Sequence, residues 1–398
     1  MKFGLETMGR LCAALGHPER SFTSILIAGT NGKGSVTAMV HQGLLAAGHR
    51  AGRYTSPHLE RLEERYVIGG EEVGTDRLRA AAGRVREASE ALLQRGDLEA
   101  PPTFFEAATA IAFELFREAG VRLAVLEVGL GGRLDATNVV SPAAVAITSI
   151  ALDHQAQLGD TVEAIAFEKA GVIRPGIPVV CGPLPPGADS VVAGVCRSLG
   201  ARLVRAPDCV DIQHVAAGAT LALRGRHQQE NAAVAACLLR ELDALGFPIG
   251  PAAIRSGLTQ AAWPGRLELF SVRGAEVLLD AAHNPAGARA LAAYLREAGW
   301  DDAVLVFGAM RDKDVPGMLA ELAPVCRRII CTTPGSPRAL AAESTCAVAE
   351  GIAGAGWTAS ATSDPVRALE EALGIARRVV VAGSIFLMGP LRGILRTA

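Results

Sequence analysis

A glycine-rich loop with one lysine follows an apolar run near the start of the chain. The apolar run is Ser24–Ala28, and the loop reads Gly29-Thr-Asn-Gly-Lys-Gly-Ser35. A loop of this kind between a buried strand and a helix suits polyphosphate, because its glycines let backbone N–H groups approach the phosphate oxygens. Lys33 adds a positive charge, and the Ser35 hydroxyl can reach a magnesium ion. A glycine-rich turn without a ligand is the alternative.

A second candidate group is a carboxylate at the end of a predicted strand. Glu127 ends the apolar run that starts at Leu123, and open α/β sheets bind ligands at the carboxyl ends of their strands. A buried carboxylate is costly unless it is paired or bound to a metal, so we interpret Glu127 as a magnesium ligand. A salt-bridged core glutamate is the alternative. The loop that follows, with Arg133 and Asp135, could hold an anionic or hydrogen-bonding substrate.

Three further polar residues have less specific signals. Ser56 offers a hydroxyl oxygen, although a Ser-Pro pair is ordinarily just a turn. His154 follows the strand predicted at Val145–Ile150, where a metal ligand and a structural hydrogen-bonding group are equally compatible with the pattern. Lys169 lies on a helix that is predicted to begin near Thr161, and a lone lysine there is ordinarily a solvated surface charge. Residue types alone leave the three roles open.

The elements around these residues alternate between strands and helices, which predicts an α/β fold with parallel sheets. The predicted strands are Leu123–Val128, Val145–Ile150, Pro178–Cys181, Val277–Asp280, Ala303–Phe307, Arg328–Cys331 and Val379–Ala382. The predicted helices are Phe104–Ala119, Gln229–Leu245, Ala286–Ala298 and Val315–Leu322.

Trp263-Pro-Gly-Arg266 interrupts this alternation, so we place a domain junction there. We predict an N-terminal P-loop ATPase domain with a mostly parallel sheet at residues 1–262 and a linker at 263–269. A smaller, Rossmann-like α/β domain is predicted at 270–398.

Composition excludes several classes of protein. The formal net charge is −2 over 398 residues, which gives no electrostatic support for nucleic-acid binding. The eight cysteines are scattered without a C-x-x-C pair, so neither a zinc site nor a disulfide framework is indicated. We find no apolar signal core and no apolar run long enough to cross a membrane. We therefore expect a cytoplasmic protein.

Nine short motifs occur in the order seen in the folylpolyglutamate synthase/dihydrofolate synthase family of the Mur-ligase superfamily, which this chain resembles. The phosphate loop itself departs from the common pattern G-x-x-x-x-G-K-[ST] and is similar to the Mur-ligase loop. The motifs are Gly29-Thr-Asn-Gly-Lys-Gly-Ser35, Thr55-Ser-Pro-His-Leu59, Thr103-Phe-Phe-Glu106, Glu127-Val-Gly-Leu-Gly-Gly-Arg-Leu-Asp-Ala-Thr-Asn138, Asp153-His154, Glu168-Lys-Ala-Gly171, His227-Gln-x-x-Asn231, Pro264-Gly-Arg266 and Asp280-Ala-Ala-His-Asn-Pro285.

The resemblance implies an ATP-dependent ligase with two Mg²⁺ sites, and a monovalent cation is a further candidate. Ser56 and Glu127 would hold one magnesium ion. His154 and a carbamylated Lys169 would hold the second, because a carbamate turns a cation into an oxygen ligand. The residues implied in ATP binding are Thr30, Asn31, Gly32, Lys33, Gly34, Ser35, Asn231, Arg266 and Asp280. The catalytic residues implied are Lys33, Lys169, His154 and His283.

The resemblance also implies which residues bind the other substrates. The pteroate-binding stretches correspond to Thr103, Phe104, Phe105 and Glu106, and to Arg133, Leu134 and Asp135. His283 and Asn284 match a signature loop of the glutamate-ligase domain. An ordinary N-cap followed by proline at Asn284-Pro285 is the alternative for that loop.

We predict a ligase that adds L-glutamate to tetrahydrofolate, and to dihydropteroate, through an acyl phosphate. The expected partners are these small molecules, and we expect a monomer that binds neither nucleic acid nor membrane. The family has a further N-terminal helix before the segment matched by Phe3-Gly-Leu-Glu6, so either the start is placed too late or the pterin pocket lacks one wall. The rivals are another Mur-type ligase, which would need a uridine-binding domain before the loop, and a nucleotide-dependent switch.

Overall fold

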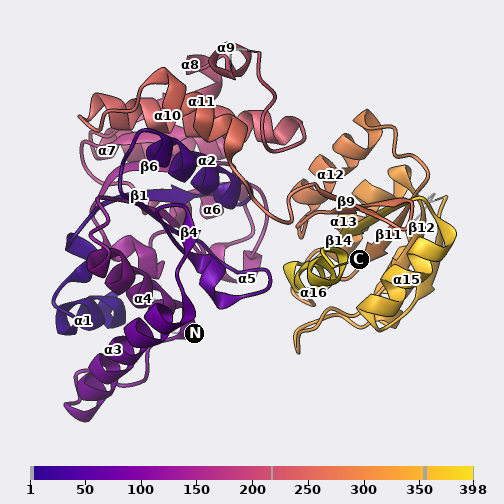
Figure 1. Ribbon diagram of the computed structural model, residues 1–398, viewed down its shortest axis with the longest axis horizontal. Helices are drawn as coiled ribbons and strands as arrows, with labels where there is room; N and C mark the ends of the chain where they lie inside the picture. Colours follow the sequence, from indigo (N-terminus) through magenta and orange to yellow (C-terminus); the bar gives the residue numbers. More distant parts are fainter. Residues whose placement is uncertain (1–3, 217, 353–355, 398) are drawn as a thin grey trace. The chain divides into compact units, whose positions relative to one another are not determined.

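The computed structural model describes residues 4–216, 218–352 and 356–397, which form two compact units (Figure 1). The first unit contains Met1–Ala222 and Gln228–Ala262, and the second contains Leu223–His227 and Trp263–Ala398. The linker predicted at 263–269 falls inside the second unit, where Glu268 already begins a strand.

The first unit is built on a sheet of eight strands within the described residues, in the order β4-β3-β2-β5-β1-β6-β7-β8. Six neighbouring strands, β2, β5, β1, β6, β7 and β8, run parallel, whereas β3 and β4 pair antiparallel at one edge. Their bounds are β1 Thr23–Ala28, β2 Ala51–Tyr54, β3 Tyr66–Ile68, β4 Glu71–Glu72, β5 Leu123–Glu127, β6 Pro142–Ile147, β7 Pro178–Cys181 and β8 Arg202–Arg205.

Helices cover both faces of this sheet. A Cβ at Gly52 of β2 would overlap the Phe116 ring, so the α4 helix packs directly on that face. The opposite face carries α2, and a Cβ at Gly257 of α11 would lie 2.7 Å from the Met39 carbonyl of α2. The helices are α1 Glu6–Ala14, α2 Lys33–Ala46, α3 Thr75–Gln94, α4 Phe104–Glu118, α5 Gln155–Leu158, α6 Val162–Ala170, α7 Pro186–Ser198, α8 Ala206–Cys209, α9 Ile212–Ala216, α10 Arg226–Ala244 and α11 Pro251–Gln260, with short 3₁₀ helices η1 Pro18–Arg20, η2 Leu62–Arg65 and η3 Ala136–Val139.

The second unit has a smaller sheet, with β13-β12-β11-β14-β10-β9 in order among the described residues. Among its described strands, the edge strand β9 alone is antiparallel to its neighbour, because it forms a hairpin with β10. The strands are β9 Glu268–Val272, β10 Ala275–Leu279, β11 Ala303–Phe307, β12 Cys326–Cys331, β13 Thr358–Ala361 and β14 Arg378–Ala382. The helices are α12 Pro285–Glu297, α13 Val315–Leu322, α14 Ala342–Glu350, α15 Pro365–Ile375 and α16 Ile385–Leu395, with the 3₁₀ helix η4 Ala323–Val325.

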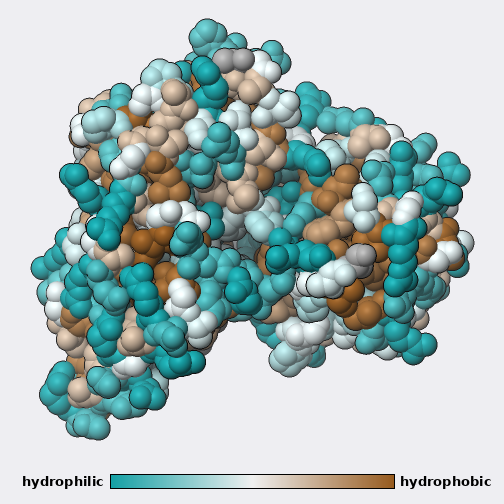
Figure 2. Space-filling model, in the orientation of Figure 1, coloured by the Kyte–Doolittle hydropathy of each residue, from teal (hydrophilic) through white to brown (hydrophobic). Residues whose placement is uncertain are grey.

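The two mostly parallel sheets confirm the predicted α/β class. One predicted strand was misplaced: it was expected at Val145–Ile150, but β6 ends at Ile147. The reason is that Thr148 and Ser149 leave the sheet and bond to the loop between β1 and α2. In the part of the chain that the structure describes, every helix is too short or too polar to span a bilayer, and hydrophobic side chains form only separate patches on the face in Figure 2.

His41 of α2 is buried against β2. Burial, and then the nearby Arg53, lower the pKa of His41 to about 3, although a backbone hydrogen bond with Ala51 opposes the shift. Among the described residues the Nε2 atom of His41 has no hydrogen-bond partner. The imidazole is therefore neutral in the folded protein near pH 7.

This buried histidine makes stability depend on pH. Between its folded pKa of about 3 and the ordinary value of 6.5, the unfolded chain binds the extra proton, so stability falls as the pH drops below 6.5. Because of His41, we expect the free energy of unfolding to fall by about 2 kcal/mol when the pH is lowered from 7 to 5. In urea titrations, His41→Gln should lose correspondingly less stability over this interval, whereas His214→Gln, at an exposed position, should follow the wild type. Equal losses in both variants would contradict the assignment.

Candidate functional site

The glycine-rich loop lies where the sequence predicted, between the end of β1 and the start of α2 at Lys33. Gly29 (φ 145°) and Gly32 (φ 85°) have backbone conformations that favour glycine. A Cβ at Gly29 would collide with Thr148, and a Cβ at Gly32 would collide with Asn231 of α10. The loop therefore has no room for side chains at these two positions, and Asn231 lies against it.

The segment after β6 holds this loop in place. The Thr30 N–H donates to the Ser149 carbonyl (2.7 Å), and the Asn31 carbonyl accepts from the Thr148 hydroxyl (2.6 Å). The Thr30 hydroxyl also bonds to both backbone groups of Ala151. Sequence reasoning missed Thr148 and Ser149, for which the only available signal was two hydroxyl residues after an apolar run.

Two lysines meet at one carbonyl oxygen of the loop. The Lys33 ammonium donates to the carbonyls of Gly29 (3.0 Å) and Thr30 (3.0 Å). Lys169 of α6 donates to the same Gly29 oxygen (2.9 Å). Lys169 is only 5% exposed, so the expectation of an ordinary solvated charge is wrong.

Burial is also what changes the acidity of Lys169. Burial, and then the positive charge of Lys33, lower the pKa of this amine to about 7, although the negative charges of Asp153 and Asp135 oppose the shift. A large share of the Lys169 amine is therefore neutral at physiological pH, and a neutral amine can act as a nucleophile.

Oxygen ligands gather at the same edge of the sheet. Glu127 ends β5 directly beside Ile27 of β1, and its Oε2 atom accepts from the backbone N–H of Ser56 (3.2 Å). The Ser35 hydroxyl, at the start of α2, is buried without a hydrogen-bond partner among the described residues. Buried hydroxyls rarely lack a partner, and hydroxyl and carboxylate oxygens are the donors that magnesium prefers. This donor set fits a magnesium ion.

His154 lies at the start of α5 with a left-handed backbone (φ 51°). Its Nε2 atom is 3.9 Å from the Asp153 carboxylate, and Asp153 in turn interacts with Lys169. Within residues 4–216, 218–352 and 356–397, no three His, Cys, Asp or Glu side chains form a preformed metal cluster. A second metal here would thus need a further oxygen ligand, and a carbamate on Lys169 would supply one.

The Asp135 carboxylate holds the loop after β5 through hydrogen bonds to its backbone. The carboxylate accepts from the backbone N–H groups of Gly129 (3.0 Å), Leu130 (2.9 Å) and Thr137 (3.0 Å). Burial raises its pKa. Arg133 of the same loop is exposed and pairs with Glu168 (2.8 Å), and Leu134 is half-buried. The geometry thus gives Asp135 a role in positioning this loop.

The predicted pteroate stretch begins α4. Thr103 and Glu106 form a reciprocal capping box, in which each side chain accepts from the backbone N–H of the other. Phe104 is 61% exposed, and the guanidinium of Arg65 lies 5.2 Å from its ring centroid. A Cβ at Gly129 would overlap Phe105. An exposed aromatic face beside a cation is thus available to a planar ligand, and sequence reasoning had missed Arg65.

The predicted residues of the second unit gather at the end of β10. Asp280 accepts from the backbone N–H groups of Leu267 (3.0 Å) and Ala282 (2.9 Å). Burial lowers the pKa of His227, while nearby Asp280 raises it and Arg266 lowers it, so these three side chains lie close together. The motif that contains His227 belonged to the resemblance, although no role was predicted for it.

The adjoining loop leads into α12. Nδ1–H of His283 donates to the Ala281 carbonyl (2.8 Å). Asn284 caps the helix, because its Oδ1 accepts from the N–H of Gly287 (2.8 Å) and Pro285 occupies the first turn. The capping interpretation of Asn284-Pro285 is therefore confirmed.

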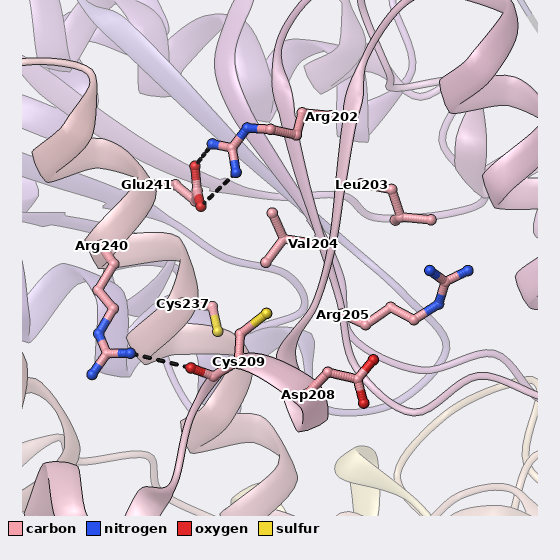
Figure 3. A pocket seen from close by; sticks show the side chains of 9 residues that line it. All are labelled: Arg202, Leu203, Val204, Arg205, Asp208, Cys209, Cys237, Arg240 and Glu241. Carbon is pink, nitrogen blue, oxygen red and sulfur yellow. Dashed lines mark hydrogen bonds and ion pairs between the residues drawn. The ribbon is translucent and has the colours of Figure 1, made fainter.

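A pocket of about 400 Å³ lies apart from these residues, along the edge strand β8 (Figure 3). Its arginines are already engaged: Arg202 pairs with Glu241, Arg205 with Asp189, and Arg240 donates to the Cys209 carbonyl. Since their charges are used within the fold, we assign this pocket no ligand.

Comparison with known proteins gives matches over nearly the whole chain. Residues 265–385 match the family model "Mur ligase, glutamate ligase domain". The chain is similar to dihydrofolate synthase/folylpolyglutamate synthase of Bacillus subtilis, with 34% identity covering 98% of this chain and 95% of the relative. The enzyme of the same name from Escherichia coli is 36% identical over 85% of this chain and 80% of its own length.

Solved structures of enzymes of the same kind also match the chain. Escherichia coli FolC in complex with DHPP and ADP matches with a TM-score of 0.87 and 31% identity, covering 100% of this chain and 94% of the other. Mycobacterium tuberculosis folylpolyglutamate synthase complexed with ADP matches with a TM-score of 0.90 and 33% identity over 98% and 94%. The bifunctional Yersinia pestis enzyme complexed with AMPPNP and a Mn ion matches with 0.85 and 33% over 100% and 94%.

The role of Asp135 as the organiser of its loop can be tested through stability. Asp135→Ala leaves the backbone N–H groups of half-buried Gly129 and Leu130 and of buried Thr137 without their acceptor, and we expect it to lower the unfolding free energy by about 3 kcal/mol. Asp208→Ala, which removes an exposed carboxylate of the same unit, should change it by less than about 0.5 kcal/mol. Urea unfolding followed by circular dichroism measures both. A loss at Asp135 as small as that of the control would contradict the assigned role.

Proposed function

Because the chain belongs to the folylpolyglutamate synthase/dihydrofolate synthase family, we propose that it is an ATP-dependent ligase that joins L-glutamate to a folate. The observation that carries this proposal is the loop at Gly29–Ser35, whose lysine and buried serine lie at one sheet edge with Glu127 and Lys169. That arrangement suits a nucleoside triphosphate and a divalent metal.

The reaction joins a carboxylate to an amine in two steps. An oxygen of the folate carboxylate attacks the γ-phosphorus of ATP, the bond to the β-phosphate oxygen breaks, and ADP and an acyl phosphate result. The glutamate amine then attacks the acyl carbon, loses a proton, and phosphate leaves. The protein supplies positioning and charge. Lys33 and the backbone N–H groups of the loop stabilise the negative charge that moves between the phosphate oxygens.

We propose two magnesium sites. Ser56 and Glu127 would hold one ion within reach of Ser35, and His154 and carbamylated Lys169 would hold the other. Bound magnesium would neutralise part of the negative charge on the phosphate oxygens. Carbamylation forms a bond between the Lys169 nitrogen and the carbon of CO₂ with loss of a proton, and it needs the neutral amine that burial favours. A monovalent cation remains a further candidate.

The second unit and the remaining substrate residues complete the proposal. Arg266 and Asp280, like Asn231, would bind ATP, and His283 would serve the glutamate half-reaction. The exposed ring of Phe104, with the buried Arg65 guanidinium beside it, would face the pterin or aminobenzoate ring of tetrahydrofolate or dihydropteroate. The monomeric state and the cytoplasmic location expected from the sequence stay predictions. ATP hydrolysis that proceeds equally without folate and glutamate would instead favour a nucleotide-dependent switch.

Lys33 is the first residue to test. Lys33→Ala removes the cation of the phosphate loop, and we expect incorporation of labelled glutamate to fall at least about 100-fold, because the charge acts on the transition state. Circular dichroism should show an unchanged fold. Arg79→Ala, which removes an exposed cation of α3, should retain wild-type turnover. Full activity in a well-folded Lys33→Ala protein would remove the loop from the mechanism.

Carbamylation of Lys169 can be tested by ¹³C labelling and by chemical rescue of a variant that lacks the amine. Protein equilibrated with ¹³C-labelled CO₂ should show a carbamate ¹³C resonance that is absent in Lys169→Ala and declines as the pH falls below about 7, since protonation removes the nucleophile. Lys169→Ala should be nearly inactive and partly restored by a short carboxylic acid. A wild-type spectrum without this resonance at pH 8 would show that the amine stays bare.

A further inference from the structure

Arg53 of β2 is placed beside the predicted metal ligand Glu127. In the parallel pairing of β2 with β5, Arg53 lies opposite Val125, and Glu127 is two residues farther along β5. Residues two apart on a strand point to the same face, so Arg53 and Glu127 are diagonal neighbours on one face of the sheet. Such diagonal neighbours are about 7–8 Å apart at the backbone, within reach of a long side chain.

This face of the sheet is the one covered by α2. Gly52, the residue before Arg53, faces Phe116 of α4 on the opposite side, and Arg53 interacts with His41 of α2. Burial lowers the pKa of Arg53 to about 10, and the negative charges of Glu127 and then Glu72 oppose this shift. A guanidinium with a pKa of about 10 remains charged at neutral pH. Arg53 is thus a largely enclosed cation, and Glu127 is its strongest electrostatic partner.

His41 does not add a second positive charge near Glu127. Its imidazole is neutral because burial and the charge of Arg53 lower its pKa to about 3. The Glu127 carboxylate is therefore influenced from two sides, by the backbone N–H of Ser56 (3.2 Å) and by the charge of Arg53. Groups that orient a metal-ligating carboxylate typically change metal affinity by about 10–100-fold when they are removed.

We propose that Arg53 is a positioning residue that holds the Glu127 carboxylate at the sheet edge and thereby sets the affinity of this site for a divalent metal. The inference rests on the proposed function for the identity of the metal site. Arg53 itself contacts neither nucleotide nor folate in this scheme. Its effect should therefore show in metal binding, and it should depend on the presence of Glu127.

Metal binding without turnover is the direct test. The probe is Mn²⁺, titrated by electron paramagnetic resonance into the full chain saturated with ADP, so that no ligation occurs. Arg53→Met keeps an apolar stem without the charge and should weaken Mn²⁺ binding by about 10-fold or more. Arg53→Lys should restore binding to within about threefold, because it returns the charge. Arg50→Met, three residues earlier and exposed, should bind Mn²⁺ like the wild type.

A double-mutant cycle asks whether Arg53 acts through Glu127. Glu127→Gln should weaken Mn²⁺ binding by itself, and adding Arg53→Met to it should weaken binding by less than about twofold further. Binding of metal-free ADP should be the same in all variants. Thermal unfolding of the metal-free proteins checks folding, and Arg53→Gln serves as the neutral variant should Arg53→Met fail to fold.

Unchanged or tighter Mn²⁺ binding in the folded neutral variant would overturn the proposal, and so would fully additive losses in the double variant. These outcomes are separable from failure of the proposed function. A protein that responds to Arg53→Met in Mn²⁺ binding but never ligates glutamate would uphold the positioning role and refute the ligase. A protein that ligates glutamate but binds Mn²⁺ equally well with and without the Arg53 side chain would uphold the ligase and refute the positioning role.

Discussion

The carbonyl oxygen of Gly29 accepts hydrogen bonds from two lysine ammonium groups, and the phosphate loop is organised around it. Lys33 reaches this oxygen from the first turn of α2, and Lys169 reaches it from α6 (3.0 and 2.9 Å). Like charges this close are unfavourable. Burial first, and then the charge of Lys33, lower the pKa of Lys169, and the cost of this arrangement would be relieved by any ligand that brings negative charge to the loop. A polyphosphate is such a ligand.

Strand order determines which residues can reach this point. The sequence β2-β5-β1-β6 places four neighbouring carboxyl ends side by side. Ser56 follows β2, Glu127 ends β5, Gly29 follows β1, and Thr148 follows β6. In a parallel sheet these ends share one edge, so residues more than one hundred positions apart meet without long connecting loops. The tight contact between Gly29 and Thr148 then fixes the loop against β6.

Local patterns were sufficient to predict the loop, the carboxylate and most central strands. The glycines and Lys33 form one continuous motif, and Glu127 directly follows an apolar run, so both signals lie within a few residues. The burial of Lys169 could not be read in this way, because it depends on how α6 packs against a loop 140 positions earlier. The same holds for Arg53, whose relation to Glu127 appears only once the register of β2 and β5 is known. Thr148 was assigned to a strand because it lies within the predicted run Val145–Ile150, and the sequence does not show that its hydroxyl bonds to the Asn31 carbonyl of the loop.

The charges around the loop also bear on the proposed carbamate. A bare Lys169 ammonium would be buried beside Lys33, with Asp153 and Asp135 as its only compensating charges among the groups that shift its pKa. A carbamate replaces this cation with an anion, so repulsion from Lys33 becomes attraction, while the nearby carboxylates become repulsive and need a cation among them. A divalent metal satisfies that requirement. Modification and metal binding would therefore stabilise each other.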